Sequence, residues 1–280
     1  MRALTFLARR FVAGDQIGDA IEAVRALNAD GLKATLDNLG EDSRDKAHAL
    51  AAADENLLML RRLGESGVDA NISLKLTQLG MGFDDELAKA SLLRIVEEAE
   101  RLGSFVRIDM EGSKFTQKTL DIFYAIHDKH PGVGIVLQAM LRRTEQDCRD
   151  AVARKVRVRL CKGAYKEPES VAFPDKRDVD ANYDKCAAIL AKAPLPAMAT
   201  HDDKRIDAAL KAFDAAGLVK SEYELQMLYG IRGKRARELR GLGHTVRIYV
   251  PYGTHWFPYF YRRIRERKEN LLFVARNFFE

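Results

Sequence analysis

Two lysines in this chain end or follow apolar, strand-like runs. Lys75 lies inside "NISLKL" (71–76), and Lys162 follows "VRVRLC" (156–161). A lysine held in apolar surroundings can lose its proton and attack a carbonyl, as in Schiff-base aldolases. A carboxylate such as Asp109 nearby would instead keep Lys75 charged and prevent that attack. The residues favour an ion pair between Lys75 and a carboxylate. The alternative is an aldolase-type lyase that uses Lys75 or Lys162.

Polar side chains close the other strand-like runs in the same way. They are Asp37, Asp109, Gln138, Thr200 with His201, Gln226 and Tyr249. Because the carboxyl ends of barrel strands meet at one end of the barrel, we expect these side chains to surround one site.

Aromatic and basic residues are concentrated near the end of the chain. Seven aromatics lie from Tyr249 to Tyr261, and Arg262 and Arg263 follow them. A basic nucleic-acid surface over 232–268 is one interpretation. The crowding of aromatics ahead of the arginines favours a dry pocket, in which two guanidinium groups bind a carboxylate.

Several common site motifs are absent from the sequence. It has no GxSxG, no GxGxxG after a strand and no Walker loop. The only close histidine pair, His127 and His130, is interpreted as a solvated helix end, so no metal site is expected.

Eight strand-like runs alternate with helical segments such as 85–103 and 202–217, and their starts are about 22 to 40 residues apart. This rhythm predicts an α/β fold, a (β/α)8 TIM-type barrel with some distortion and extra N-terminal helices; an open doubly wound sheet is the alternative. The runs are 32–37, 71–76, 105–110, 134–139, 156–161, 196–201, 223–227 and 245–250.

The length and composition fit one catalytic domain. The 280 residues, 47% apolar, are expected to form an N-terminal helical arm (1–30) and a barrel (31–280). The net charge of +5 suits an anionic cofactor, an anionic substrate or a membrane surface. Three scattered cysteines indicate a reducing compartment, so a cytoplasmic protein is expected. No apolar run is long enough to cross a bilayer.

The motifs "SLKL", "RIDME", "VLQA", "VRLCKGAY", "ATH", "YELQMLYG", "RIYVPYG" and "YFYRRIRE" occur in this order. Together they resemble the proline dehydrogenase family, from about residue 70 to 270, and its short single-domain form most of all. The resemblance implies a flavin-dependent barrel. It would oxidise L-proline to 1-pyrroline-5-carboxylate, the first step of proline catabolism, by hydride transfer to N5 of FAD. Many members have tryptophan where this chain has Lys166.

The resemblance also implies roles for individual residues. Those expected to contact FAD are Gln138, Arg159, Lys162, Gly163, Ala164, Lys176, Thr200 and His201. Arg262 and Arg263 would bind the proline carboxylate. The proline pocket would be completed by Lys75, Asp109, Tyr165, Leu228, Tyr249 and Tyr259.

The resemblance finally implies a gate and an electron acceptor. The glycine-rich segment 79–86 would be a lid, latched by Arg263 with Glu65 or Glu266. Electrons would pass to a membrane quinone, and the basic, aromatic C-terminal region would contact the membrane surface without spanning it. Nucleic acid is not an expected partner.

Overall fold

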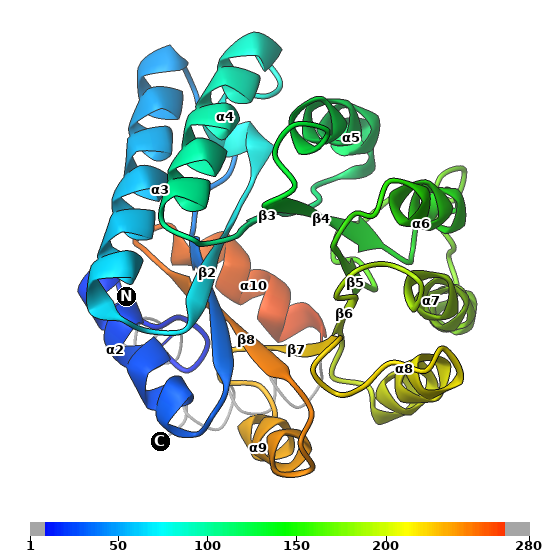
Figure 1. Ribbon diagram of the computed structural model, residues 1–280. Coiled ribbons are helices and arrows are strands. Elements are labelled where there is room, and N and C mark those ends of the chain that lie inside the picture. The colour runs from blue at the N-terminus through cyan, green and yellow to red at the C-terminus, as the bar shows by residue number, and fades with distance from the viewer. Residues whose placement is uncertain (1–8, 267–280) are drawn as a thin grey trace, which may run out of the picture.

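The computed structural model describes residues 9–266, with side chains described for residues 9–261. Eight parallel strands form a closed barrel in the order β1-β2-β3-β4-β5-β6-β7-β8 (Figure 1). The strands are β1 (Lys33–Asn38), β2 (Ala70–Leu74), β3 (Val106–Ile108), β4 (Val133–Gln138), β5 (Val158–Cys161), β6 (Ala197–Ala199), β7 (Glu224–Leu228) and β8 (Val246–Tyr252). The predicted (β/α)8 barrel is therefore confirmed, and the open-sheet alternative is wrong.

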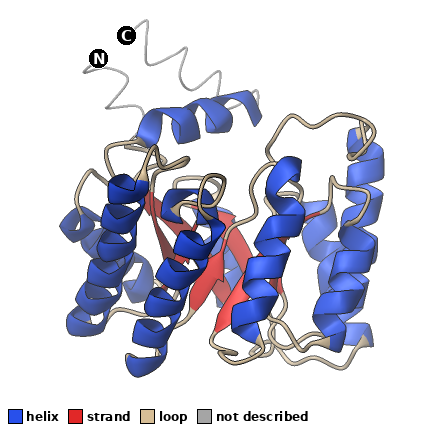
Figure 2. Cartoon of the chain, turned by 90° about the horizontal axis from the view of Figure 1, so that it is seen from above, coloured by secondary structure: helices blue, strands red, loops and turns tan. Residues whose placement is uncertain are grey.

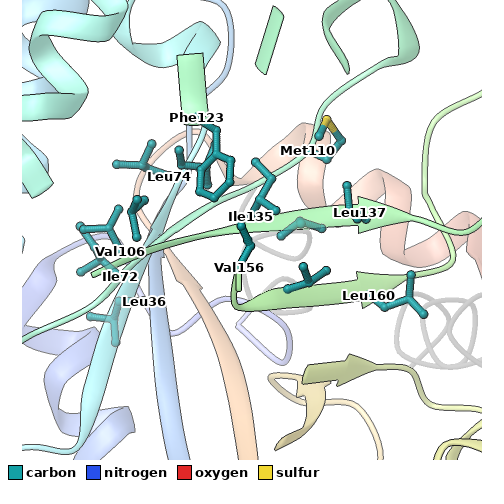
Figure 3. Packing of buried hydrophobic residues seen from close by; sticks show 14 of the residues in the cluster. Leu36, Ile72, Leu74, Val106, Met110, Phe123, Ile135, Leu137, Val156 and Leu160 are labelled. Atoms are coloured by element: carbon teal, nitrogen blue, oxygen red, sulfur yellow. The ribbon is translucent and has the colours of Figure 1, made fainter. Parts of the chain in front are cut away.

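Alternation along each strand separates an apolar layer from a polar barrel interior. Leu36, Ile72, Ile135 and Leu160 belong to the main hydrophobic cluster between the strands and the helices (Figure 3). Successive side chains point to opposite faces of a strand, so the residues next to these four along each strand face the barrel axis. Arg159 is one of them, and it reaches across the interior to β2 and β3. The interior thus carries the polar side chains that the strand ends display.

Helices surround the barrel and connect its strands (Figure 1). They are α2 (Ile17–Ala29), α3 (Lys46–Ser66), η1 (Leu76–Leu79), α4 (Asp85–Arg101), α5 (Ser113–His127), α6 (Thr144–Ala153), α7 (Lys176–Leu190), α8 (Asp203–Ala215), α9 (Gly233–Gly241) and α10 (Trp256–Glu266). Among the described residues, none of these helices has both the length and the apolar content needed to cross a membrane.

A small hydrophobic cluster, which we call the roof, covers part of the carboxyl end of the barrel. It consists of Phe11, Val12, Leu39, Ile231, Tyr259 and Phe260. α10 lies across this end of the barrel (Figure 2). The segment before α2 is fixed to the end of β8 and to the residue that follows it, because the Ala13 N–H donates to the Pro251 carbonyl and the Gly253 N–H to that of Gly14 (both 2.9 Å). The roof thus joins the two ends of the described chain.

The predicted strands agree with the observed ones within a few residues, with one difference that affects a site residue. Tyr249 does not end its strand, because β8 continues through Tyr252. The longer strand pairs with all of β1, from Lys33 opposite Arg247 to Asn38 opposite Tyr252.

Candidate active site

A buried ion pair stands at the carboxyl ends of β1 and β2. β2 ends because the chain turns into η1, and Lys75 is the residue that caps this short helix. The Lys75 Nζ lies 3.1 Å from Asp37 Oδ2 and 4.0 Å from Asp109 Oδ2. Burial disfavours the charged ammonium, but the carboxylates of Asp37 and Asp109 outweigh it and raise the pKa of Lys75. The expected ion pair is confirmed, with Asp37 as the closer partner.

Asp109 connects this ion pair to side chains on three strands. Its Oδ1 accepts from Ser73 Oγ (2.6 Å) and from Arg159 Nη1 (2.9 Å), and its Oδ2 accepts from Tyr249 Oη (2.8 Å). Burial and the neighbouring carboxylates of Asp109 and Asp37 raise the pKa of Tyr249 well above its usual value, so its hydroxyl remains a donor. One carboxylate thus fixes side chains from β2, β5 and β8.

Arg159 and Gln138 lie on the neighbouring strands β5 and β4, where Gln138 pairs with Cys161. Arg159 is 5% exposed, and its Nε donates to Gln226 Oε1 at 2.6 Å. Gln138 is also buried, and its Nε2 donates to the Glu111 carbonyl at 2.9 Å. Both predicted cofactor residues therefore have fixed orientations at the same end of the barrel as Lys75.

The chain turns sharply after β5 at Gly163. Its φ of +112° is unfavourable for side-chain-bearing residues, and a Cβ here would lie 2.3 Å from Met140 Sδ. Just before it, the Lys162 Nζ lies 2.5 Å from Asp180 and 2.9 Å from Asp202. Ala164 is exposed. The glycine thus lets the backbone pack closely against Met140, directly after the lysine at the strand end.

Charged residues in the N-terminal halves of α7 and α8, and at the N-cap of α8, form a network around Lys162, which we call the outer network. It consists of Lys162, Lys176, Asp180, Asp184, Asp202 and Arg205. Lys176 pairs with Asp180 and lies 3.7 Å from Asp202. Most of these residues line a cavity of about 760 Å³ between the two helices.

Thr200 and His201 follow β6, and their side chains bond to the start of the next segment and to β7. The Thr200 Oγ1 accepts from the Asp202 N–H at 3.2 Å. The His201 Nε2 accepts from the Leu228 N–H of β7 at 3.0 Å. Both residues thus lie at the carboxyl ends of the strands, as predicted.

The remaining predicted pocket residues lie in or against the roof and, for Tyr165, beside a second small hydrophobic cluster. Leu228 and Tyr249 pack against the roof, to which Tyr259 belongs. Tyr165 packs against Met140 and Leu141 and acts electrostatically on Lys75. Arg262, Arg263 and Glu266 are in α10, but their side chains lie outside the described part of the structure.

Two predictions need correction. α3 begins after the carboxyl end of β1 and ends before the amino end of β2, so Glu65, in its last turn, lies at the opposite end of the barrel, where it pairs with Arg62. Glu65 therefore cannot latch a lid over the site. His127 is not solvated but 8% exposed, and it packs against Phe123 with ring centroids 5.2 Å apart.

Other residues belong to the site but were not predicted as site residues. Ser73 contacts Asp109 and Arg159, and Asp180 and Asp202 hold Lys162. Glu41, in the loop after β1, acts electrostatically on both Lys75 and Glu111. The sequence offered one usable signal, because Asp202 directly precedes a helix and caps it through the Lys204 N–H.

The fold and this ring of side chains define a (β/α)8-barrel enzyme with its site at the carboxyl ends of the strands. A sequence model of the proline dehydrogenase family matches residues 20–276. The chain belongs to that family.

Individual relatives agree with this assignment. Proline dehydrogenase 1 of Bacillus subtilis (strain 168) is 41% identical over 270 residues, which cover 96% of this chain and 89% of that protein. Proline dehydrogenase of Deinococcus radiodurans is 38% identical, with 96% and 89% covered. The crystal structure of proline utilization A from Bdellovibrio bacteriovorus has the same fold, with a TM-score of 0.88 at 23% identity over 96% of this chain and 33% of that one.

Membership of the family implies a flavin cofactor, and the residues present fit one. Gln138 and Arg159 present buried amide and guanidinium donors on adjacent strands, and Gly163 gives the turn after β5 a backbone without a side chain. Lys162, Lys176 and Arg205 provide cations of the kind that bind phosphate groups, next to the cavity between α7 and α8.

Proposed function

We propose that residues 1–280 form one catalytic domain that oxidises L-proline to 1-pyrroline-5-carboxylate, with FAD as the cofactor. FAD, when bound, supplies the hydride acceptor, its N5 atom, for the hydride that leaves proline C5. The amine proton is released as the C=N bond forms, so the two electrons and both hydrogens are accounted for. The chain itself binds, orients and encloses the reactants.

The observation that carries this proposal is the position of Asp109 between two groups of residues. On one side, Asp109 accepts from Arg159, which we assign to the flavin with Gln138, Lys162, Gly163, Ala164, Lys176, Thr200 and His201. On the other side, it lies 4.0 Å from Lys75, which we assign to the proline carboxylate. A single carboxylate thus fixes the distance between a cofactor group and a substrate group, which a hydride transfer requires.

We assign the other side of proline to α10 and the roof. Arg262 and Arg263 are proposed to bind the carboxylate together with Lys75, and Glu266 to hold Arg263. Tyr165, Leu228, Tyr249 and Tyr259 would enclose the ring and exclude water. The segment 79–86, which contains the half-exposed Phe83, is proposed as the lid.

The ion pairs argue against the aldolase alternative. A Schiff-base lysine must be neutral to attack a carbonyl, and Asp37 raises the pKa of Lys75 instead of lowering it. Lys162 is held by two carboxylates. Neither lysine is in the apolar surroundings that this chemistry needs.

A membrane quinone is the proposed electron acceptor. Phe257 and Tyr261 are 56% and 52% exposed on α10, and their rings stack with centroids 6.5 Å apart. This aromatic edge, at the cofactor end of the barrel, is the surface proposed to contact the membrane. Phe257→Ser should reduce co-sedimentation with anionic lipid vesicles; unchanged co-sedimentation would remove this surface from the proposal.

The test of the central proposal is the visible absorption spectrum of the purified protein under anaerobic conditions. Flavin bands should be present, and L-proline should bleach them. Acid extraction should release FAD. Flavin bands that persist with L-proline would contradict the substrate, and a protein that takes up no added FAD would contradict the cofactor.

A further inference from the structure

Glu111 is a buried carboxylate whose two oxygens both bind one residue. It follows β3 and is 4% exposed. Its Oε1 accepts from the Thr77 N–H at 3.1 Å, and its Oε2 accepts from the Thr77 hydroxyl at 2.5 Å. Because both donors belong to η1, this carboxylate fixes the short helix that Lys75 caps.

Thr77 passes this restraint on to the loop after β1. Its hydroxyl accepts from the Asp42 N–H at 3.2 Å, and its carbonyl accepts from the Ser43 N–H at 3.0 Å. Asp42 has a φ of +51°, a conformation that residues other than glycine seldom adopt without support. The bonds to Thr77 supply that support.

The same loop carries a charge that reaches the substrate end of the site. Glu41 precedes Asp42 and acts electrostatically on Lys75 and on Glu111. On its other side, the Glu111 carbonyl accepts from Gln138, which we assign to the flavin. Glu111 is therefore bonded to the cofactor side directly and to the β1 loop through Thr77.

We infer that Thr77 and Glu111 are positioning residues that hold the loop 39–45 over the substrate end of the site, and that the ionised form of Glu111 does so. The inference rests on the proposed oxidation of proline. The side chains of Thr77 and Glu111 touch neither the proposed substrate nor the proposed flavin.

The burial of Glu111 makes this restraint sensitive to pH near neutrality. Burial raises the pKa of Glu111 to about 7, and the charge of Glu41 acts in the same direction. The bonds from Thr77 and the charge of Lys75 lower this pKa but do not outweigh the burial. An ionised carboxylate accepts both bonds from Thr77. A protonated one has an O–H group in place of one acceptor, so the link through the Thr77 hydroxyl is weakened as the pH falls.

The test compares Thr77→Val with Thr77→Ser. Valine has a similar shape but removes the hydroxyl that donates to Glu111 and accepts from Asp42, whereas serine keeps it. We expect Thr77→Val to raise KM for L-proline about tenfold, the change that corresponds to about 1.4 kcal/mol, with kcat changed less and flavin content unaltered. Thr77→Ser should restore KM. A KM in Thr77→Val equal to that of the wild type would overturn the inference.

Amide hydrogen exchange, resolved by residue with NMR, provides a readout that does not depend on activity. Thr77→Val removes the acceptor of the Asp42 N–H but leaves the carbonyl that accepts from Ser43. If the loop is released, both amides should exchange faster. Faster exchange at Asp42 alone would show the loss of one bond without release of the loop, and it would overturn the inference.

The pH profile supplies the last test. In the wild type, kcat/KM for L-proline should decline below about pH 7 as Glu111 takes up a proton, and this limb should be absent in Glu111→Gln. The same limb in both proteins would overturn the assignment to Glu111. Failure of the wild type to oxidise proline at all would instead contradict the proposed function, so the two failures are distinguishable.

Discussion

The charged groups of the barrel interior differ from those of the outer network in how far they are removed from water. In the interior, the side chains of Lys75 and Asp37 are 8% and 0% exposed, and those of Arg247 and Glu224 are 8% and 3% exposed. In the outer network, the Lys162 side chain is 25% exposed and that of Lys176 is 74% exposed. Buried partners depend on each other, whereas solvated ones are screened and can exchange.

This difference suits the two ligands that we assign to these regions. A small substrate needs a pocket whose charges do not move. The two interior pairs are connected, because Asp109 lies 4.0 Å from Lys75 and accepts from Arg159, Arg159 donates to Gln226, and Gln226 donates to Glu224. A phosphate-containing cofactor must displace carboxylates from lysines as it binds. The exposed lysines of the outer network can do that at small cost.

The largest effect on stability is expected when one partner of a buried interior ion pair is removed and the other is left. Asp37→Ala leaves the Lys75 ammonium buried with only Asp109 at 4.0 Å, and it should lower the free energy of unfolding by about 3 to 5 kcal/mol. Urea denaturation measures this change. Asp37→Ala combined with Lys75→Met should recover much of the loss. A loss below about 1 kcal/mol in the single variant would show that this pair behaves like a surface pair.

A second interior pair predicts the response to acid. The Arg247 guanidinium binds Glu224 at 2.8 Å and, despite the opposing effect of burial, lowers the pKa of Glu224 to about 2. The unfolded pKa is higher, near 4.3, so this stabilisation is complete above about pH 5 and is lost as the pH falls towards 2. The difference corresponds to about 3 kcal/mol. Glu224→Gln should remove this part of the acid dependence of unfolding; an unchanged profile would contradict it.

A substitution at Gly163 tests whether the turn after β5, on the side assigned to the cofactor, tolerates a side chain. Gly163→Ala places a methyl group at a φ of +112° and 2.3 Å from Met140 Sδ, so we expect a destabilisation of about 1 to 3 kcal/mol and lower flavin occupancy. Gly241→Ala is the matched control, because its Cβ would meet no atom within 4 Å. Equal effects of both substitutions on thermal stability and flavin absorbance would count against a special role for Gly163.

The smallest change in stability is expected in the outer network. Lys176→Met should alter the free energy of unfolding by less than about 1 kcal/mol. It should nevertheless weaken FAD binding at low salt, and the difference should shrink at high salt because the exposed charge is screened. Lys185→Met, also on α7 but paired with Glu145, serves as the control. A salt-independent effect of Lys176→Met would contradict an electrostatic role.

The fold could be read from local patterns because each βα unit carries its own signals. Alternating apolar residues predicted the strands, and glycines such as Gly103 marked helix ends, where the structure has a φ of +63°. A polar residue at each strand end then indicated a common site. The same reasoning could have placed Glu65 correctly, because a helix of 21 residues is about 30 Å long and its last turn must lie at the far end of the barrel.

The partners inside the site could not be predicted in the same way. Asp37 lies near the end of β1 and Asp109 directly follows β3, and the sequence does not tell which of them is closer to Lys75; the distances are 3.1 Å for Asp37 and 4.0 Å for Asp109. Likewise, Asp180 and Asp202 reach Lys162 from two different helices. Such contacts depend on three-dimensional packing between segments that are far apart in the sequence.

The roof has a consequence for the order in which the parts of the protein fold. Phe11 and Phe260, whose ring centroids are 6.1 Å apart, come from opposite ends of the described chain. On the ribosome, the N-terminal segment emerges first, and its roof partners Tyr259 and Phe260 are synthesised last. Closing so long a loop is entropically unfavourable until the barrel has brought its ends together. The cover of the active site should therefore assemble last, after the barrel beneath it has formed.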